Sequence, residues 1–203
     1  MTNSTEISAT QQHKSLGIAS RSKNPIEEAF PEYAKYKKDD FEVSLYCKHK
    51  ADMDPKVIKF AFKLAEANVG PYYKTCKLGW QPKIKQNELN KNWARYLVAV
   101  DTKKKQPVAY AMFRFDLDYG SSVLYCYEMH VEKSSQRKGL GRFMMTALEN
   151  CARHFGLEKI VLTVLKNNPE GTAFFTSLGY TEDETSPDKA DEEDYEILAK
   201  KLT

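Results

Sequence analysis

The central part of the chain carries the clearest hydrophobic pattern. Between residues 139 and 155, apolar side chains recur at every third or fourth position, which predicts an amphipathic helix. Residues 123–132 alternate in the manner of a half-buried strand, and residues 159–165 form an almost unbroken apolar run typical of a buried strand. Strand, loop, helix and strand therefore form one βαβ unit.

The rest of the chain adds further elements on both sides of this unit. Asp54 and Pro55 are a favourable helix start, with Asp as the N-cap and Pro at the first position. Residues 116–122 are predicted to turn the chain. Periodicity predicts strands over 41–49, 93–101, 106–115 and 195–200, and helices over 25–37, 55–71, 82–91 and 169–178. The predicted fold class is α/β, a mixed central sheet flanked by helices with an N-terminal helical extension.

Composition limits the domain organisation and the compartment. Residues 1–24 are polar and lack periodicity, which predicts a tail that is disordered or only loosely docked, and residues 25–203 are predicted to form a single domain. The chain is 41% hydrophobic and 29% charged, as ordinary soluble proteins are. It has no apolar run of membrane-span length, no apolar region typical of a signal peptide near residue 1 and no cysteine spacing typical of a zinc site. We expect a protein of the nucleus and cytoplasm, without a membrane or a metal.

The net charge of +3 is unevenly distributed. Residues 182–196 hold nine acidic residues against Lys189 alone, a local charge of −8, so the remainder carries 3 − (−8) = +11. Such a run is usually a solvated loop. The alternative is that its field attracts a basic substrate.

A glycine loop stands between the predicted strand and helix of the βαβ unit. Residues 136–141 read Gln-Arg-Lys-Gly-Leu-Gly, and a helix N-terminus after such a loop is an anion site suited to a pyrophosphate. The motif alone is equally typical of a tight turn. Its spacing is neither that of a dinucleotide-binding loop nor that of a P-loop.

The loop in this context resembles the acetyl-CoA loop of the GNAT acetyltransferase superfamily. The segment 168–180, with an Asn after a strand, a short helix and a closing Leu-Gly-Tyr, resembles a second hallmark of that superfamily. From residue 25 onward the chain is similar to NatD-type N-alpha-acetyltransferases, which act on histone tails beginning Ser-Gly-Arg-Gly. The similar segments are 29–31 (Ala-Phe-Pro), 93–97 (Trp-Ala-Arg-Tyr-Leu), 113–116 (Phe-Arg-Phe-Asp), 123–128 (Val-Leu-Tyr-Cys-Tyr-Glu), 137–141 (Arg-Lys-Gly-Leu-Gly), 162–164 (Leu-Thr-Val) and 195–198 (Tyr-Glu-Ile-Leu).

This resemblance implies the GNAT acyltransferase fold, acetyl-CoA as the acetyl donor and a protein α-amine as the acceptor. The glycine loop would hold the CoA pyrophosphate, and residues 129–131 would offer backbone groups to the pantetheine arm and to the developing oxyanion. Asn168 would mark the other wall of the cofactor site. The implied cofactor-binding residues are Met129, His130, Val131, Gln136, Arg137, Lys138, Gly139, Leu140, Gly141, Arg142, Asn168 and Phe174.

Glu128 is the predicted proton acceptor. A protein α-amine has a pKa of about 8, so a carboxylate acting through water is a suitable base. The alternative is a strand Glu that faces solvent or pairs with a Lys. Tyr127 and Tyr195 complete the implied catalytic set as residues of the peptide slot, with Tyr195 as a proton donor or substrate clamp. Alternation places Tyr125 and Tyr127 on one face of the strand, and Cys126 and Glu128 on the other.

Asp116 and Asp118 are the implied contacts for the substrate's α-amine and for arginine at its third position, since a carboxylate binds a guanidinium tightly. The alternative is that both merely form a turn. Two residues depart from the family pattern. Phe175 replaces a Tyr that often protonates the CoA thiolate, and Leu78 replaces a frequent Trp. The implied substrate-binding residues are Tyr73, Leu78, Asp116, Asp118, Tyr125, Tyr127, Thr163 and Tyr195.

Several readings of the function stay open at this point. The first is N-terminal acetylation of histone tails of the four and two-A classes, by direct attack without an acyl-enzyme and without an obligatory auxiliary subunit. Cys126 lies in a predicted strand core, where a cytosolic Cys is usually inert, which disfavours a cysteine nucleophile. The alternatives are a GNAT enzyme for lysine or small amines, and a non-catalytic module that binds acyl-CoA or histone tails. The N-terminal tail is a candidate contact for the nucleosome or the ribosome.

Overall fold

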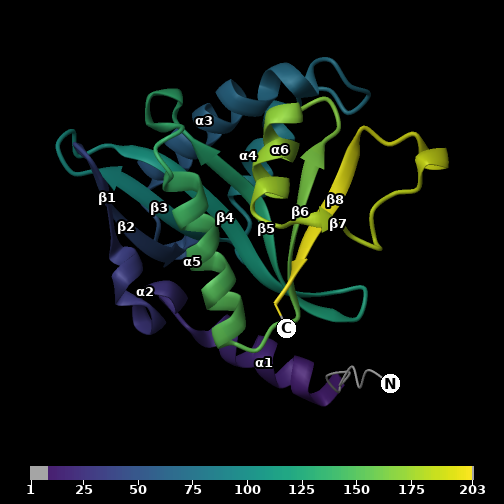
Figure 1. Ribbon diagram of the computed structural model, residues 1–203, viewed down its shortest axis with the longest axis horizontal. Coiled ribbons are helices and arrows are strands. Elements are labelled where there is room, and N and C mark those ends of the chain that lie inside the picture. The colour runs from purple at the N-terminus through teal and green to yellow at the C-terminus, as the bar shows by residue number, and fades with distance from the viewer. Residues whose placement is uncertain (1–8, 203) are drawn as a thin grey trace.

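The computed structural model describes residues 9–202, which are built around one eight-stranded sheet (Figure 1). Its strand order is β1-β2-β3-β4-β5-β6-β8-β7. Only β5 and β6 pair in parallel, and the helix α5 (Leu140–His154) connects them, as the sequence predicted. The strands are β1 (Lys35–Lys38), β2 (Phe41–His49), β3 (Arg95–Asp101), β4 (Pro107–Asp118), β5 (Ser121–Val131), β6 (Lys159–Leu165), β7 (Thr181–Glu182) and β8 (Tyr195–Lys201).

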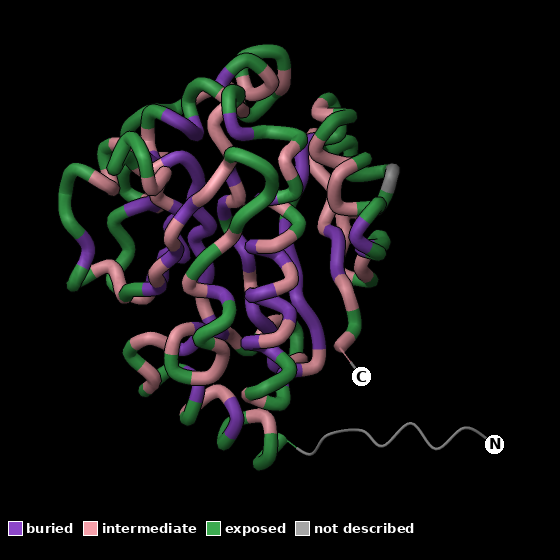
Figure 2. Tube along the Cα trace, turned by 60° about the vertical axis from the view of Figure 1, so that its left-hand side comes forward, coloured by how far each residue is buried: buried purple, intermediate pink, exposed green. Residues whose placement is uncertain are grey.

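Helices cover both faces of the sheet, with α5 and α6 (Pro169–Ser177) on one face and α3 (Pro55–Tyr73) and α4 (Pro82–Leu89) on the other (Figure 1). Each face has its own apolar core. The larger cluster joins α5 to the central strands, and a second cluster lies beneath α3 and α4. Buried residues accordingly concentrate in the central strands and along one side of α5 (Figure 2).

The helix α3 begins where the sequence predicted. The Asp54 carboxylate accepts a hydrogen bond from the Lys56 amide at 2.8 Å, and Pro55 takes the first helical position. The helix continues through Pro71 to Tyr73, so Tyr73 lies at its C-terminal end. Within residues 9–202, no helix combines the length and the apolar character needed to cross a bilayer.

The N-terminal segment is more ordered than its composition predicted. Residues Ala9–Arg21 form the helix α1, which lies against β4 and β5 and buries Ala19 in the larger core. The Arg95 guanidinium donates hydrogen bonds to the carbonyls of Ser20 (2.7 Å) and Ser22 (3.2 Å). Residues Ala9–Arg21 are therefore helical rather than disordered, because partners distant in sequence hold this polar helix. Residues 1–8 lie outside the described part of the chain.

The predicted helix over residues 25–37 is divided into three elements. Helix α2 (Pro25–Ala29) is followed by a 3-10 turn (Pro31–Ala34) and then by β1. Pro31 explains the break, since a residue before proline is pushed out of the helical region, and Phe30 has φ −143°. The short strands β1 and β7 lie at the two edges of the sheet and were not predicted from the sequence.

The strand β4 extends three residues beyond its predicted end. Asp116 and Asp118 pair with Val123 and Ser121 of β5, so they are ladder residues and the predicted turn over 116–122 is wrong. The turn itself is only Tyr119 and Gly120, with φ values of 44° and 87°. Two central residues with positive φ suit the twist of a two-residue hairpin, which lets both strands run on to the turn.

Candidate functional site

The glycine loop ends in a left-handed residue at the start of α5. Gly139 is the N-cap with φ 85°, and Arg137 before it also has positive φ. A Cβ on Gly139 would overlap the Tyr36 hydroxyl, which donates a 2.5 Å hydrogen bond to the Lys138 carbonyl. Glycine is therefore required at position 139 both by the backbone and by this close approach. The loop presents the first amides of α5, which have no partner within the helix.

Three elements meet at the second glycine of the loop. A Cβ on Gly141 would lie 3.1 Å from Phe174 of α6 and 3.7 Å from Met129 of β5. Asn168 caps α6 by accepting a hydrogen bond from the Gly171 amide at 3.0 Å. The structure thus gathers Gly141, Phe174 and Met129, all predicted cofactor residues, while the Asn168 side chain is used to start its own helix.

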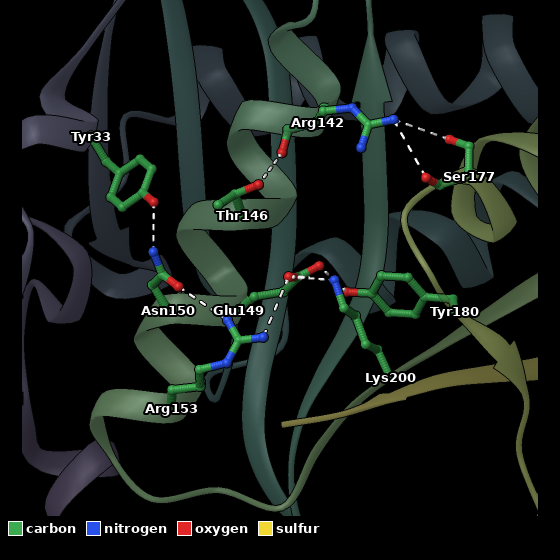
Figure 3. A network of polar contacts seen from close by, with 9 residues as sticks. All are labelled: Tyr33, Arg142, Thr146, Glu149, Asn150, Arg153, Ser177, Tyr180 and Lys200. Atoms are coloured by element: carbon green, nitrogen blue, oxygen red, sulfur yellow. Dashed lines mark hydrogen bonds and ion pairs between the residues drawn. The ribbon is translucent and has the colours of Figure 1, made fainter. Parts of the chain in front are cut away.

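A polar network holds α5 against the sheet and α6 (Figure 3). Buried Glu149 accepts hydrogen bonds from Lys200 of β8 at 2.7 Å and from the Tyr180 hydroxyl at 3.3 Å. In the first turn of α5, the Arg142 guanidinium is directed at the carbonyl and hydroxyl of Ser177 at the end of α6. The network therefore fixes where the α5 N-terminus points, and it engages one of the three predicted basic groups of the loop with α6.

A β-bulge interrupts β5 at Tyr127. Met112 of β4 pairs with Glu128, whereas the next residue, Phe113, pairs with Cys126, so Tyr127 has no partner in the ladder. The extra residue reverses the alternation: Cys126 enters the core beneath α5, and Glu128 contacts α4 on the opposite side of the sheet. The prediction that these two side chains share one face is wrong, because it assumed a regular strand.

The strands β5 and β6 part just after this bulge. Their pairing joins Val123–Cys126 to Lys159–Leu162 and goes no further, although β5 continues to Val131 and β6 to Leu165. The bulge and the end of pairing coincide, which leaves the second half of β5 unpaired on its β6 side. This segment, Tyr127–Val131, runs towards the glycine loop.

These features fit the acetyl-CoA expected from the sequence. A helix N-terminus with unpaired amides, next to the side chains of Arg137 and Lys138, suits a pyrophosphate. Two predicted contacts have other partners: the His130 side chain contacts Glu128, and the Val131 carbonyl accepts hydrogen bonds from Asn68 and Gln136. The individual cofactor contacts stay predictions.

Glu128 lies in a buried charged cluster. Its side chain is 7% exposed, and one carboxylate oxygen accepts a 2.5 Å hydrogen bond from Lys85 of α4. The other oxygen contacts His130 Nε2, which must carry the hydrogen, since an ionised carboxylate only accepts. Lys85 also pairs with Glu88 at 2.7 Å. The pairing with a Lys, one of the two alternatives in the sequence, is thus present.

This cluster sets the proton affinity of Glu128. Burial opposes the charged form, but Lys85 and His130 outweigh it and lower the pKa of the Glu128 carboxyl to about 2. Burial lowers the pKa of the Lys85 ammonium, yet Glu128 and Glu88 prevail and raise it. Glu128 is therefore ionised at neutral pH, as a proton acceptor must be, but it is a weaker base than a free glutamate.

An aromatic row crosses the sheet beside this cluster. The ring of Tyr127 lies 4.8 Å from that of Trp93 and 4.6 Å from that of Tyr125. The Tyr125 hydroxyl continues the row by a 2.8 Å hydrogen bond with the Thr163 hydroxyl of β6. Burial raises the pKa of Tyr125, with further increases from Tyr127, Asp118 and Tyr195. The row, Trp93–Tyr127–Tyr125–Thr163, thus gathers three of the predicted substrate residues, and Tyr195 acts on it electrostatically.

Asp116 and Asp118 differ in their surroundings although they share a face of β4. Asp116 forms an ion pair with Arg114, which stands two residues earlier on the same strand. Among residues 9–202, Asp118 has no side-chain ion-pair partner. Burial is the main cause of the raised pKa of Tyr127 in the aromatic row, and the negative charge of Asp118 raises it further.

The segment between α3 and α4 lies next to the acidic segment. The Lys77 amide donates a 2.5 Å hydrogen bond to the Asp194 carboxylate, and its ammonium lies 3.3 Å from the carboxylate of Glu192. Tyr73 at the end of α3 lies beneath Lys85, whose ammonium is 5.8 Å from its ring centre. Leu78, which follows Lys77 in the segment between α3 and α4, is 39% exposed. The acidic segment is therefore held at the same side of the molecule as Tyr73.

Sequence reasoning missed three residues that surround the predicted catalytic groups: Lys85, Arg114 and Trp93. The sequence analysis assigned no role to Lys85, within the predicted helix 82–91, or to Arg114, within the predicted strand 106–115. Arg114 shares a strand face with Asp116, a spacing of two that could have indicated their contact. No local signal connects Lys85 with Glu128, which is 43 residues away.

Comparisons with known proteins give one family. The model described as "Acetyltransferase (GNAT) family" matches residues 62–180, more than half of the chain. Similar solved structures include a GNAT-family acetyltransferase from Staphylococcus aureus (TM-score 0.60, 11% identity, covering 79% of this chain and 100% of that one). A second is the ribosomal-protein-S18-alanine N-acetyltransferase of Escherichia coli (TM-score 0.54, 18% identity, covering 78% of this chain and 94% of that one). A third is the spermidine/spermine N-acetyltransferase SpeG of Vibrio cholerae (TM-score 0.51, 17% identity, covering 79% of this chain and 94% of that one). At these identities the likeness shows a common fold.

Proposed function

We infer the acceptor amine from the site itself, because this chain belongs to the GNAT acetyltransferase family and hence transfers acetyl groups from acetyl-CoA. We propose that the acceptor is the N-terminal serine amine of histone tails beginning Ser-Gly-Arg-Gly. The observation that carries the proposal is the site beside Glu128, where Asp118 and the aromatic row lie together and offer a carboxylate and ring faces to a basic peptide. The similarity of segments such as 123–128 to NatD-type enzymes supports the same acceptor.

The chemistry proposed for this site is a direct attack by the α-amine. Acetyl-CoA supplies the acetyl group as a thioester when bound. Glu128 takes the amine proton through water, and its low pKa keeps it in the ionised form that can accept a proton. Because it is a weak base, the step relies on an amine that is already partly neutral at pH 7 to 8. The Tyr127 hydroxyl stays protonated, because burial raises its pKa more than Arg114 lowers it, so Tyr127 can donate a proton to the departing thiolate. Tyr195 is the second candidate for that donation.

A cysteine nucleophile does not suit this site. The Cys126 thiol is buried beneath α5, on the opposite side of the sheet from Glu128, and it lies within 3.4 Å of the Glu128 carbonyl. Burial, with a smaller effect of Glu128, raises the pKa of this thiol to about 12. A thiol that is hardly ionised at neutral pH is a poor nucleophile, which supports transfer without an acyl-enzyme.

A second candidate acceptor is a lysine side chain or a small polyamine. The acidic segment 182–196 favours it, because its charge attracts any polycation. The structurally similar SpeG is a spermidine/spermine N-acetyltransferase. A non-catalytic module that binds acyl-CoA or histone tails is the third reading, and the buried charged cluster at Glu128 argues against it, since a binding module has no need of a base.

The proposed substrate also suggests partners and compartments. We propose that the protein acts in the nucleus and the cytoplasm on histone tails, with the nucleosome and the ribosome as the two places where such a tail is met. It would act without an obligatory auxiliary subunit.

The acceptor is identified by locating the new acetyl group. A peptide with the first twenty residues of a tail beginning Ser-Gly-Arg-Gly contains both an α-amine and lysines, so fragment-ion mass spectrometry after one turnover separates them. We expect the acetyl group on the N-terminal serine alone. Acetyl groups on lysines, or faster turnover of spermidine than of the peptide, would establish the second candidate instead.

A further inference from the structure

The side chain of Arg114 occupies a position that is suited to a peptide arginine. Its guanidinium carbon lies 4.9 Å from the ring centre of Trp93 and 6.0 Å from that of Tyr127. The same guanidinium pairs with the Asp116 carboxylate, and the two side chains are 27% and 25% exposed. Arg114 is thus stacked on two aromatic rings, paired with one carboxylate and still accessible from solvent.

These contacts are the ones that a guanidinium needs for recognition. Aromatic faces attract it through their quadrupole, and a carboxylate binds its planar fork through charge-assisted hydrogen bonds. Asp118, two residues further along β4 on the same face, has no ion-pair partner among the described residues. The strand therefore holds one carboxylate that is already paired and one that is available, next to a single set of rings.

We propose that Arg114 is an internal competitor for the basic residue of the substrate. In the free enzyme it fills the guanidinium position on Trp93, Tyr127 and Asp116. A peptide with arginine at its third position displaces it and uses the same rings together with Asp116 and Asp118. A peptide without that arginine leaves Arg114 in place, so Arg114 sets the selectivity of the site. This inference rests on the proposed function for its substrate, but the guanidinium position itself does not depend on it.

The competition has a definite consequence for Arg114→Gln. A partly exposed ion pair and a cation–π contact each correspond to about a two- to fivefold change in an equilibrium constant, so we expect the KM for a Ser-Gly-Arg-Gly peptide to fall by about fivefold to tenfold. The KM for a Ser-Gly-Ala-Gly peptide should stay unchanged, because that peptide does not use the position. Arg114→Lys keeps the charge and loses the planar fork. Its KM for the Ser-Gly-Arg-Gly peptide should therefore lie between those of Arg114→Gln and the wild type.

The matched control is Lys83→Gln on the neighbouring helix α4. Lys83 is exposed, and its replacement removes the same single positive charge from the same side of the sheet. We expect both KM values of this variant to equal those of the wild type. A KM that falls equally in Lys83→Gln would attribute the effect to net charge and overturn the inference. A KM for the arginine peptide that is unchanged or raised in Arg114→Gln would also overturn it, since Arg114 would then be neutral or would orient Asp116 for the substrate.

A binding measurement separates this inference from the proposed function. N-acetyl-arginine amide has no α-amine and cannot be acetylated at its N-terminus, so it reports the guanidinium position alone. We expect it to change the fluorescence of Trp93 and to bind Arg114→Gln about fivefold to tenfold more tightly than the wild type. If the peptide is not acetylated but this difference is present, the proposed function fails and the inference holds. If the peptide is acetylated and the difference is absent, the inference fails alone.

Discussion

Removal of the Lys85 ammonium should destabilise the protein because it leaves the Glu128 carboxylate buried without its nearest cation. In the intact cluster the pKa of Glu128 is lowered from 4.5 to about 2. At about 1.4 kcal/mol for each pKa unit, this shift corresponds to roughly 3 kcal/mol of stability at neutral pH. His130 supplies part of this lowering of the pKa and remains in the variant. We therefore expect Lys85→Met to lower the free energy of unfolding by about 2–4 kcal/mol at pH 7.5.

The loss should depend on pH in a direction that follows from the cluster. In the wild type the lowered pKa of Glu128 contributes stability that is present above pH 4.5 and is lost as the pH falls towards 2. In Lys85→Met burial is less opposed, so the pKa of Glu128 rises, and the carboxyl can become protonated at a smaller cost in mild acid. The difference between variant and wild type should therefore stay nearly constant from pH 7.5 to 5 and shrink as the pH falls below 4.5, where the carboxyl of the variant is protonated before that of the wild type.

Urea denaturation followed by the fluorescence of Trp80 and Trp93 measures both effects. Lys83→Met is the control, because Lys83 is exposed on the same helix and its loss should change the free energy of unfolding by less than about 0.5 kcal/mol. Adding Glu128→Gln to Lys85→Met should restore part of the stability, since a neutral amide does not need the cation. The reasoning is refuted if Lys85→Met is no less stable than Lys83→Met, or if its loss is the same at pH 3.5 and pH 7.5.

Four further changes test other parts of the site. Glu128→Gln should lower kcat by about 10²-fold to 10⁴-fold and change the KM for the peptide little in steady-state kinetics. A kcat equal to that of the wild type would show that Glu128 is not the base. Asp118→Asn should raise the KM for peptides with arginine third and not for those with alanine there. Gly139→Ala should raise the KM for acetyl-CoA, because alanine at φ 85° costs about 1–2 kcal/mol and disturbs the loop; an unchanged KM would contradict the assigned position of the loop. Deletion of residues 1–22 should lower the Tm by roughly 5 °C or more, since Arg95 loses its buried carbonyl partners; an unchanged Tm would mean that α1 contributes nothing to stability.

The βαβ unit could be predicted from the sequence because its signals are local. The stripe of α5 and the apolar run of β6 follow the periods of their elements, and the predicted bounds of β6 agree with those observed. The same holds for β2 and for the start of α3 at Asp54 and Pro55. In each case a hydrophobic period or a capping residue within the segment determines the structure.

The features that the sequence did not reveal depend on contacts between distant segments. The bulge at Tyr127 is a property of the register between two strands, and no residue in β5 marks it. It decides which side of the sheet Glu128 faces, and hence that Lys85 is its partner. The helix α1 is likewise ordered by Arg95 and by the β4–β5 hairpin rather than by its own pattern. Such pairings need the three-dimensional arrangement.

The acceptor amine is the central claim, and turnover of acetyl-CoA with three peptides tests it most directly. One peptide begins Ser-Gly-Arg-Gly with a free α-amine, the second is identical with its α-amine blocked, and the third begins Ser-Gly-Ala-Gly. We predict efficient turnover of the first, none of the second, and a reduced kcat/KM for the third because it lacks the guanidinium. Equal turnover of the first and second peptides would mean that lysines are the acceptors and would contradict the account.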